Sequence, residues 1–144
     1  MTFIKGGMVS VWVGEFLSDQ DLRSYVEWTY ESEDGESQCE FARYSGLGWF
    51  DHDFQEASFI GHHPSDYVGA LSRHSHEESF RDSAAAALIA TEDRTWNSLF
   101  LLFGCAYDPK KAHPSKACRL HFVGCFPFQR NPSGGTDVRI RVFA

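Results

Sequence analysis

The stretch that decides the fold is "VSVWVGEFLSDQDLRSYV", residues 9–26, where the hydrophobic period changes from that of a strand to that of a helix. Val9, Val11 and Val13 alternate with Ser10 and Trp12. A period of two with β-branched residues on one face is typical of a β-strand, which we expect over residues 8–14.

A helix is predicted directly after this strand. Ser18 with Asp21 three residues later has the form of a capping box, with Asp in place of the usual Glu or Gln. With Ser18 as the N-cap, Leu17 and Leu22 would occupy the two positions of a hydrophobic staple. The helix periodicity is carried by Leu22, Tyr25, Val26 and Thr29.

The same capping signature recurs twice further along the chain. Ser37 with Glu40 predicts a short helix that Gly46 ends, and Ser75 with Glu78 predicts a longer one. One face of the longer helix would carry Phe80, Ala84, Ala87, Leu88 and Thr91.

The last third is aromatic and strand-like. Residues 96–107 and 119–128 predict an antiparallel pair joined by the polar loop 108–117, and residues 138–143, "VRIRVF", predict an edge-like strand. Because strands and helices do not alternate regularly, we expect an α+β fold over residues 1–144 as a single domain. Its sheet would be mainly antiparallel and packed against three to four helices.

Composition and cysteine spacing bound the cellular setting. The 144 residues contain 15% aromatic side chains, as a packed globular protein does. The N-terminus lacks the pattern of a signal peptide, and no apolar run is long enough to span a membrane. The four cysteines form no C-x-x-C pair, so a reducing cytoplasm is the simplest setting.

Acidic residues are concentrated in the first half of the chain. Residues 1–64 hold 12 Asp or Glu and 3 Lys or Arg, a net charge of −9, whereas residues 65–144 hold 8 and 10, a net charge of +2. A negative surface repels phosphate backbones, so a basic protein is a better partner than nucleic acid.

Residues 48–59, "GWFDHDFQEASF", interleave acids with aromatic rings. As a strand, the stretch would place Phe50, His52 and Phe54 on one face, with Trp49, Asp51 and Asp53 on the other. The Phe face would then be core and the Asp face solvent. Alternatively, the acids form a surface for a basic ligand, anchored by Trp49.

Catalytic signatures are missing from the sequence. It contains no G-x-S-x-G elbow, no P-loop and no G-x-G-x-x-G, and its seven histidines match no zinc-site spacing. We therefore expect neither enzymatic activity nor a cofactor. The alternative is a small metal-dependent enzyme with a site around Asp51 and His52.

The order of these motifs resembles the immunity protein 22 family of bacterial polymorphic toxin systems. The resemblance rests on a V-x-V-W-V-G strand, an S-x-x-x-L-x-x-Y helix and an aromatic-Asp-x-Asp-Phe-x-Glu segment, which here place Trp12, Gly14, Leu22, Tyr25, Phe50, Asp51, Asp53, Phe54 and Glu56. His52 departs from the family pattern, in which this position is often acidic. The resemblance implies a non-enzymatic cytoplasmic protein that neutralises a toxin by binding it.

Charge and resemblance together give one hypothesis for the partner. The expected toxin is basic, for example a nuclease, and the chain would contact neither nucleic acid nor membrane. The expected contact residues are Trp49, Asp51, Asp53 and Glu56, together with Glu33, Asp34 and Glu36 of the acidic loop. The chain would be a monomer, or a homodimer paired through residues 138–143.

Overall fold

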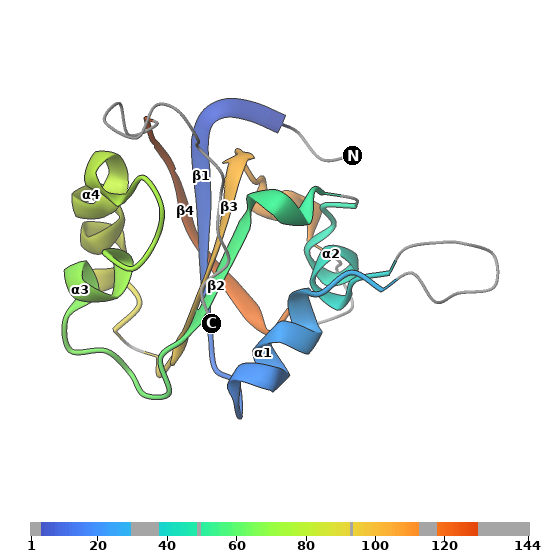
Figure 1. Cartoon of the computed structure of the whole chain (residues 1–144), viewed down its shortest axis with the longest axis horizontal. Coiled ribbons are helices and arrows are strands. Elements are labelled where there is room, and N and C mark those ends of the chain that lie inside the picture. The colour runs from blue at the N-terminus through green and yellow to red at the C-terminus, as the bar shows by residue number, and fades with distance from the viewer. Residues whose placement is uncertain (1–3, 30–37, 49, 93, 113–117, 130–144) are drawn as a thin grey trace.

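The computed structural model describes residues 4–29, 38–48, 50–92, 94–112 and 118–129 (Figure 1). They form a four-stranded antiparallel sheet with the strand order β2-β3-β1-β4. The strands are β1 (Ile4–Gly14), β2 (Gln55–Phe59), β3 (Ser98–Cys105) and β4 (Leu120–Pro127). This confirms the predicted α+β class.

Helices cover both faces of this sheet. Figure 1 shows α1 (Asp19–Val26) and α2 (Glu40–Ser45) on one side of it, and α3 (Tyr67–Leu71) and α4 (Glu77–Ile89) on the other. Two short 3-10 helices, η1 (His52–Phe54) and η2 (Pro109–Lys111), lie in connections. No helix among the described residues is long and apolar enough to cross a bilayer.

β1 is a central strand, and its side chains serve both layers. Val9, Val11 and Val13 are buried in the core that faces α3 and α4. Trp12 points the other way, and its ring lies 5.0 Å edge-on from that of Phe41 in α2. The alternation predicted from residues 9–13 is therefore confirmed.

The buried face of α4 was predicted correctly, but the residue at which the helix begins was not. Phe80, Ala84 and Leu88 are buried against the sheet, and the small Ala84 allows close approach. The N-cap is His76 rather than Ser75, with a left-handed backbone (φ 57°). The short α3 preceding it had no clear signal in the sequence.

The predicted pairing of the two late strands is wrong. β3 and β4 do not pair with each other; β1 lies between them and is antiparallel to both. β3 and β4 therefore run in the same direction, which a hairpin loop cannot join. β1 and β3 are the two inner strands, and both bury side chains on both faces of the sheet.

Local helix signals had mixed outcomes. Ser18 is the N-cap of α1, and its Oγ accepts from the Asp21 N–H at 3.1 Å. The hydrophobic staple is wrong, because Leu17 is 91% exposed while Leu22 is buried. α2 begins at Glu40, later than predicted, and ends at Gly46 as predicted. Residues 138–143 lie outside the described part of the chain.

Candidate partner-binding surface

The acidic stretch forms a turn rather than a strand. Residues 52–54 are the 3-10 helix η1, and the strand begins only at Gln55. The predicted alternation therefore fails: Phe50 is buried, whereas Phe54 is 42% exposed. A 3-10 helix has about three residues per turn, so every third side chain points the same way. The period of two that a strand shows cannot continue through it.

Phe50 anchors the turn to the core. Its ring lies 5.2 Å from Trp28 and 6.0 Å from Phe41, both in edge-on geometry. Aromatic edge-to-face packing of this kind adds to the hydrophobic burial of the rings. Trp49, the predicted apolar anchor, lies outside the described residues.

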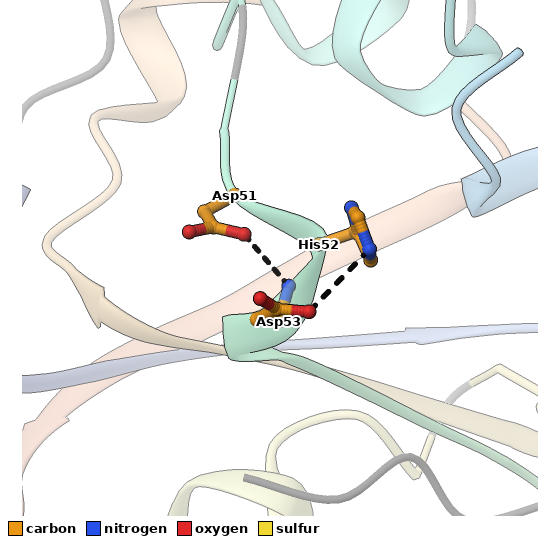
Figure 2. A group of neighbouring side chains, drawn as sticks. All are labelled: Asp51, His52 and Asp53. Atoms are coloured by element: carbon orange, nitrogen blue, oxygen red, sulfur yellow. Dashed lines mark hydrogen bonds and ion pairs between the residues drawn. The ribbon is translucent and has the colours of Figure 1, made fainter. Parts of the chain in front are cut away.

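Asp51 and Asp53 are fixed by hydrogen bonds inside the turn (Figure 2). Oδ1 of Asp51 accepts from the Asp53 N–H at 3.0 Å, and the Asp51 carbonyl accepts from the Phe54 N–H at 3.0 Å. His52 Nε2 lies 3.4 Å from Asp53 Oδ1. The side chains of His52 and Asp53 are 58% and 77% exposed, so the turn presents them to solvent.

Glu56 does not belong to this surface, which corrects its predicted role. It has no exposed area, and its Oε1 contacts His74 Nδ1 at 3.0 Å and accepts from the Ser75 N–H at 3.0 Å. As the second residue of β2, it points into the layer beneath the α3–α4 connection. Its carboxylate holds that connection to the sheet.

His74 also contacts Ser58, with 3.0 Å between Nε2 and Oγ. The order Ser58–His74–Glu56 is that of a hydrolytic triad. All three side chains are buried, however, and Ser58 has no exposed area. A substrate carbonyl cannot reach that hydroxyl, so the arrangement is structural. This arrangement could not be predicted from the sequence, because the three residues meet only through tertiary packing.

The turn also meets one distance criterion for a metal site. Asp51, His52 and Asp53 each offer a ligand atom, and these atoms lie within 4.8 Å of one another. Two of those groups are already engaged with each other inside the turn, and the site is open to solvent. A hydrogen-bonded acidic turn that binds no ion has the same internal contacts and the same exposure to solvent.

An open groove of about 440 Å³ lies beside the turn. Helix α1, the segment after it, His52 and the start of β2 supply its lining: Gln20, Arg23, Val26, Glu27, Trp28, His52, Gln55 and Ala57. Spacing of three and four between Gln20, Arg23 and Glu27 marks one face of a helix, a signal that was available in the sequence. The sequence did not show that these residues lie close to His52.

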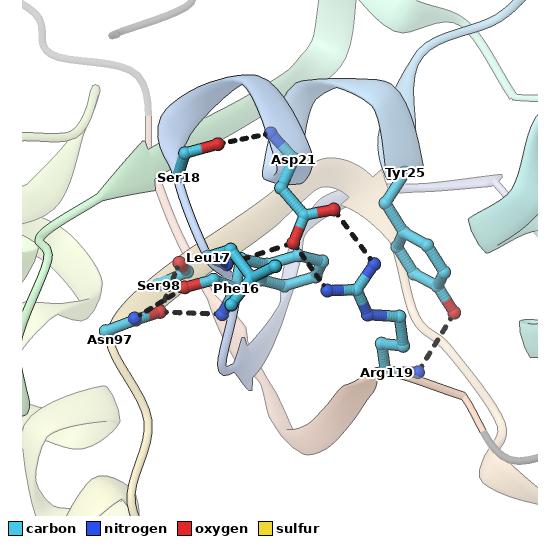
Figure 3. A network of polar contacts seen from close by, with 8 residues as sticks. All are labelled: Phe16, Leu17, Ser18, Asp21, Tyr25, Asn97, Ser98 and Arg119. Carbon is cyan, nitrogen blue, oxygen red and sulfur yellow. Dashed lines mark hydrogen bonds and ion pairs between the residues drawn. The ribbon is translucent and has the colours of Figure 1, made fainter.

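Ion pairs neutralise most of the acid on α1. Asp19 binds Arg23 at 2.7 Å, and Asp21 binds Arg119 through two contacts of 2.7 and 3.2 Å. Figure 3 shows the second pair, with Asp21 also accepting from the Leu17 N–H. The Arg119 guanidinium holds the pKa of Asp21 below its usual value, with the Leu17 bond adding to the effect. Asp21 and Arg119 thus join α1 to the start of β4.

Glu27, Asp51 and Asp53 contact no Lys or Arg among the described residues. Glu27 is the C-cap of α1. A carboxylate is electrostatically unfavourable at a helix C-terminus, so local stability does not explain it. These three carboxylates lie around the groove and the turn. Glu33, Asp34 and Glu36 lie outside the described residues.

The structure defines the class of the protein. It is an α+β protein with an antiparallel sheet between two layers of helices, and an acidic turn lies beside a polar groove. A family model described as Immunity protein 22 matches residues 9–129, so the chain belongs to this family. The match confirms the resemblance drawn from the strand, helix and acidic motifs. No curated protein and no solved structure matches the chain.

Proposed function

We propose that this protein binds a cognate toxin in the bacterial cytoplasm and neutralises it, without catalysis, through the surface formed by the η1 turn. The observation that carries the proposal is the rigid presentation of Asp51 and Asp53. Phe50 anchors the turn from below, and the Asp51 cap fixes it from within. A preorganised acidic turn loses little conformational freedom on binding.

The charge of the surface favours a basic toxin. Nucleases attract phosphate and therefore carry positive surfaces, which an acidic inhibitor would match. The proposed contact set keeps Asp51 and Asp53, adds Glu27, and retains Trp49, Glu33, Asp34 and Glu36 from the sequence. Glu56 is removed from it because the residue is buried.

Charge substitution at the turn tests the proposal. Asp53→Lys combined with Asp51→Asn replaces two negative charges by one positive charge, while the Asn side-chain oxygen can still cap the turn. We expect association with the toxin encoded beside this gene to slow by about tenfold at low salt, measured by surface plasmon resonance. The difference should shrink at high salt, because screening weakens exposed charges.

Asp82→Lys is the matched control. Asp82 is exposed on α4, on the opposite side of the sheet, and its substitution raises the net charge by two units, one fewer than the turn variant. An equal slowing by this control would show that total charge, and not the turn, steers binding. Undiminished association of the turn variant would refute the assignment of the surface.

A metal at the turn is the competing interpretation, motivated by the spacing of Asp51, His52 and Asp53. Elemental analysis of untagged protein separates the two. Stoichiometric metal that is lost in the turn variant would support the metal site, whereas metal well below one equivalent would remove its premise.

A further inference from the structure

Two polar atoms in the wall of the groove lack hydrogen-bond partners. Trp28 Nε1 and Gln55 Oε1 are buried, and neither has a partner among the residues that the structure describes. Both residues line the groove beside the η1 turn. Buried polar groups are nearly always satisfied in folded proteins, so each unmet group calls for an explanation.

The two groups differ in how freely they can move. Trp28 is held by its edge-on contact with Phe50 at 5.2 Å and packs on the core. Gln55 is only 8% exposed, at the first position of the edge strand β2. Its terminal amide can still turn, because that torsion has broad minima. Both atoms have almost no exposed surface, so a ligand reaches them only by displacing the groups that cover them. The groove then offers a fixed donor and an adjustable acceptor.

The rest of the lining suits a side chain that is partly apolar. Val26, Ala57 and the Trp28 ring supply apolar surface, while Gln20, Glu27 and His52 are polar. Such a combination of apolar surface and a few polar groups is typical of a recess that receives one anchoring side chain.

We propose that this groove binds a side-chain carboxamide, an Asn or Gln, of the toxin. The inference rests on the proposed function and names the chemistry of its contact. A carboxamide offers one acceptor group and one donor group, and the wall lacks a partner for one donor and for one acceptor. Lys and Arg carry donors only, so they would leave Trp28 Nε1 unmet. Asp and Glu carry acceptors only and would be repelled by Glu27 and the turn.

The groove and the turn then have different tasks. Exposed charges chiefly set the rate of encounter, whereas buried hydrogen bonds set the lifetime of the complex. A groove with unmet polar groups also discriminates, because a toxin without the carboxamide leaves those groups unpaired.

Gln55→Met tests the inference, since Met has a similar length and no polar amide. We expect the toxin to dissociate about tenfold faster, with little change in association rate. We also expect the free variant to be as stable as the wild type or more stable, because the substitution removes an unmet acceptor. A merely structural Gln55 would give the opposite change in stability.

Gln129→Met is the matched control, because it makes the same exchange of side chain at an exposed residue beside α4, outside the lining of the groove. Its dissociation rate should stay within about twofold of the wild type. Unchanged dissociation for Gln55→Met would overturn the inference while the proposed function stood. Failure of the wild-type protein to bind the toxin would instead refute the proposed function.

Two further measurements test the inference if the Gln55→Met variant does not fold. The indole N–H resonance of Trp28, assigned with Trp28→Phe, should shift when unlabelled toxin is added to the wild-type protein, and an unmoved resonance would contradict the inference. In a double-mutant cycle, an Asn or Gln of the toxin should couple to Trp28→Phe. Coupling only to toxin Lys or Arg would show that the groove takes a cation.

Discussion

Glu56 is a carboxylate without exposed surface, and its position explains why an acid occurs inside β2. Its Oε1 contacts His74 and accepts from the Ser75 N–H, so one side chain joins the edge strand to the connection before α4. Burying a carboxylate is costly unless such partners compensate it. Glu56 therefore contributes to the fold, whereas Asp51 and Asp53, a few residues earlier, are the residues that we propose for binding.

Removing Glu56 should weaken folding more than binding. For Glu56→Ala we expect the free energy of unfolding to fall by about 3 kcal/mol, because His74 and the Ser75 N–H lose a buried partner. Urea denaturation followed by circular dichroism measures this. Asp53→Ala, an exposed acid three residues away, should change stability by less than about 0.5 kcal/mol. Equal losses from the two substitutions would show that burial of Glu56 is not important.

At the scale of the element, α2 shows how one residue can end a helix and also make room for a distant segment. Gly46 has a φ of 77° and donates its N–H to the Ala42 carbonyl at 3.2 Å. A Cβ at this position would overlap the carbonyl of Lys111 in η2. The end of α2 thus needs glycine both for its backbone conformation and for close packing.

Gly48 provides the comparison that separates these two requirements. It has a similar φ of 71°, but a Cβ there would meet nothing within 4 Å. Gly48→Ala should cost about 1–2 kcal/mol, the penalty of the left-handed backbone alone. Gly46→Ala should cost clearly more, because η2 must also move. Thermal and urea unfolding of both variants would check this, and equal costs would contradict the packing argument.

At the scale of the whole molecule, burial of thiol and phenol groups should make the free energy of unfolding decrease at high pH. Burial is the main cause that raises the pKa of Cys39 and of Cys105 to about 11, and that of Tyr107 to about 12. It also raises the pKa of Tyr25, where a hydrogen bond with Cys118 adds to the effect. In the unfolded chain the same groups release their protons at a lower pH.

Stability should therefore be constant with respect to these groups below about pH 8, and fall as the pH rises from 9 to 12. Across this range the folded state holds more protons than the unfolded state, so the slope of unfolding free energy against pH is negative. Urea midpoints at each pH would measure it. Cys39→Ala with Cys105→Ala should flatten the curve between pH 9 and 11, and an unchanged slope would contradict the assignment to thiols.

Features that depend on neighbouring residues were readable from the sequence. The strand and the two faces of β1, the Ser18 cap, the Gly46 stop and the buried face of α4 all follow from periods and caps within a few residues. The motif order was also sufficient to identify the immunity protein 22 family. The role of Asp51 and Asp53 in binding stays a prediction; Asp53 is exposed and Asp51 is half-buried.

Tertiary structure alone decided which strands lie beside β1, that Glu56 faces inward to His74, and that Trp28 and Gln55 share a groove with the turn. Each of these brings together residues far apart in the sequence or turns a side chain toward one layer or another. Local periodicity says which side chains share a face, but not what covers that face. Only the competition among all apolar faces for burial determines this, and it is settled when the whole chain packs.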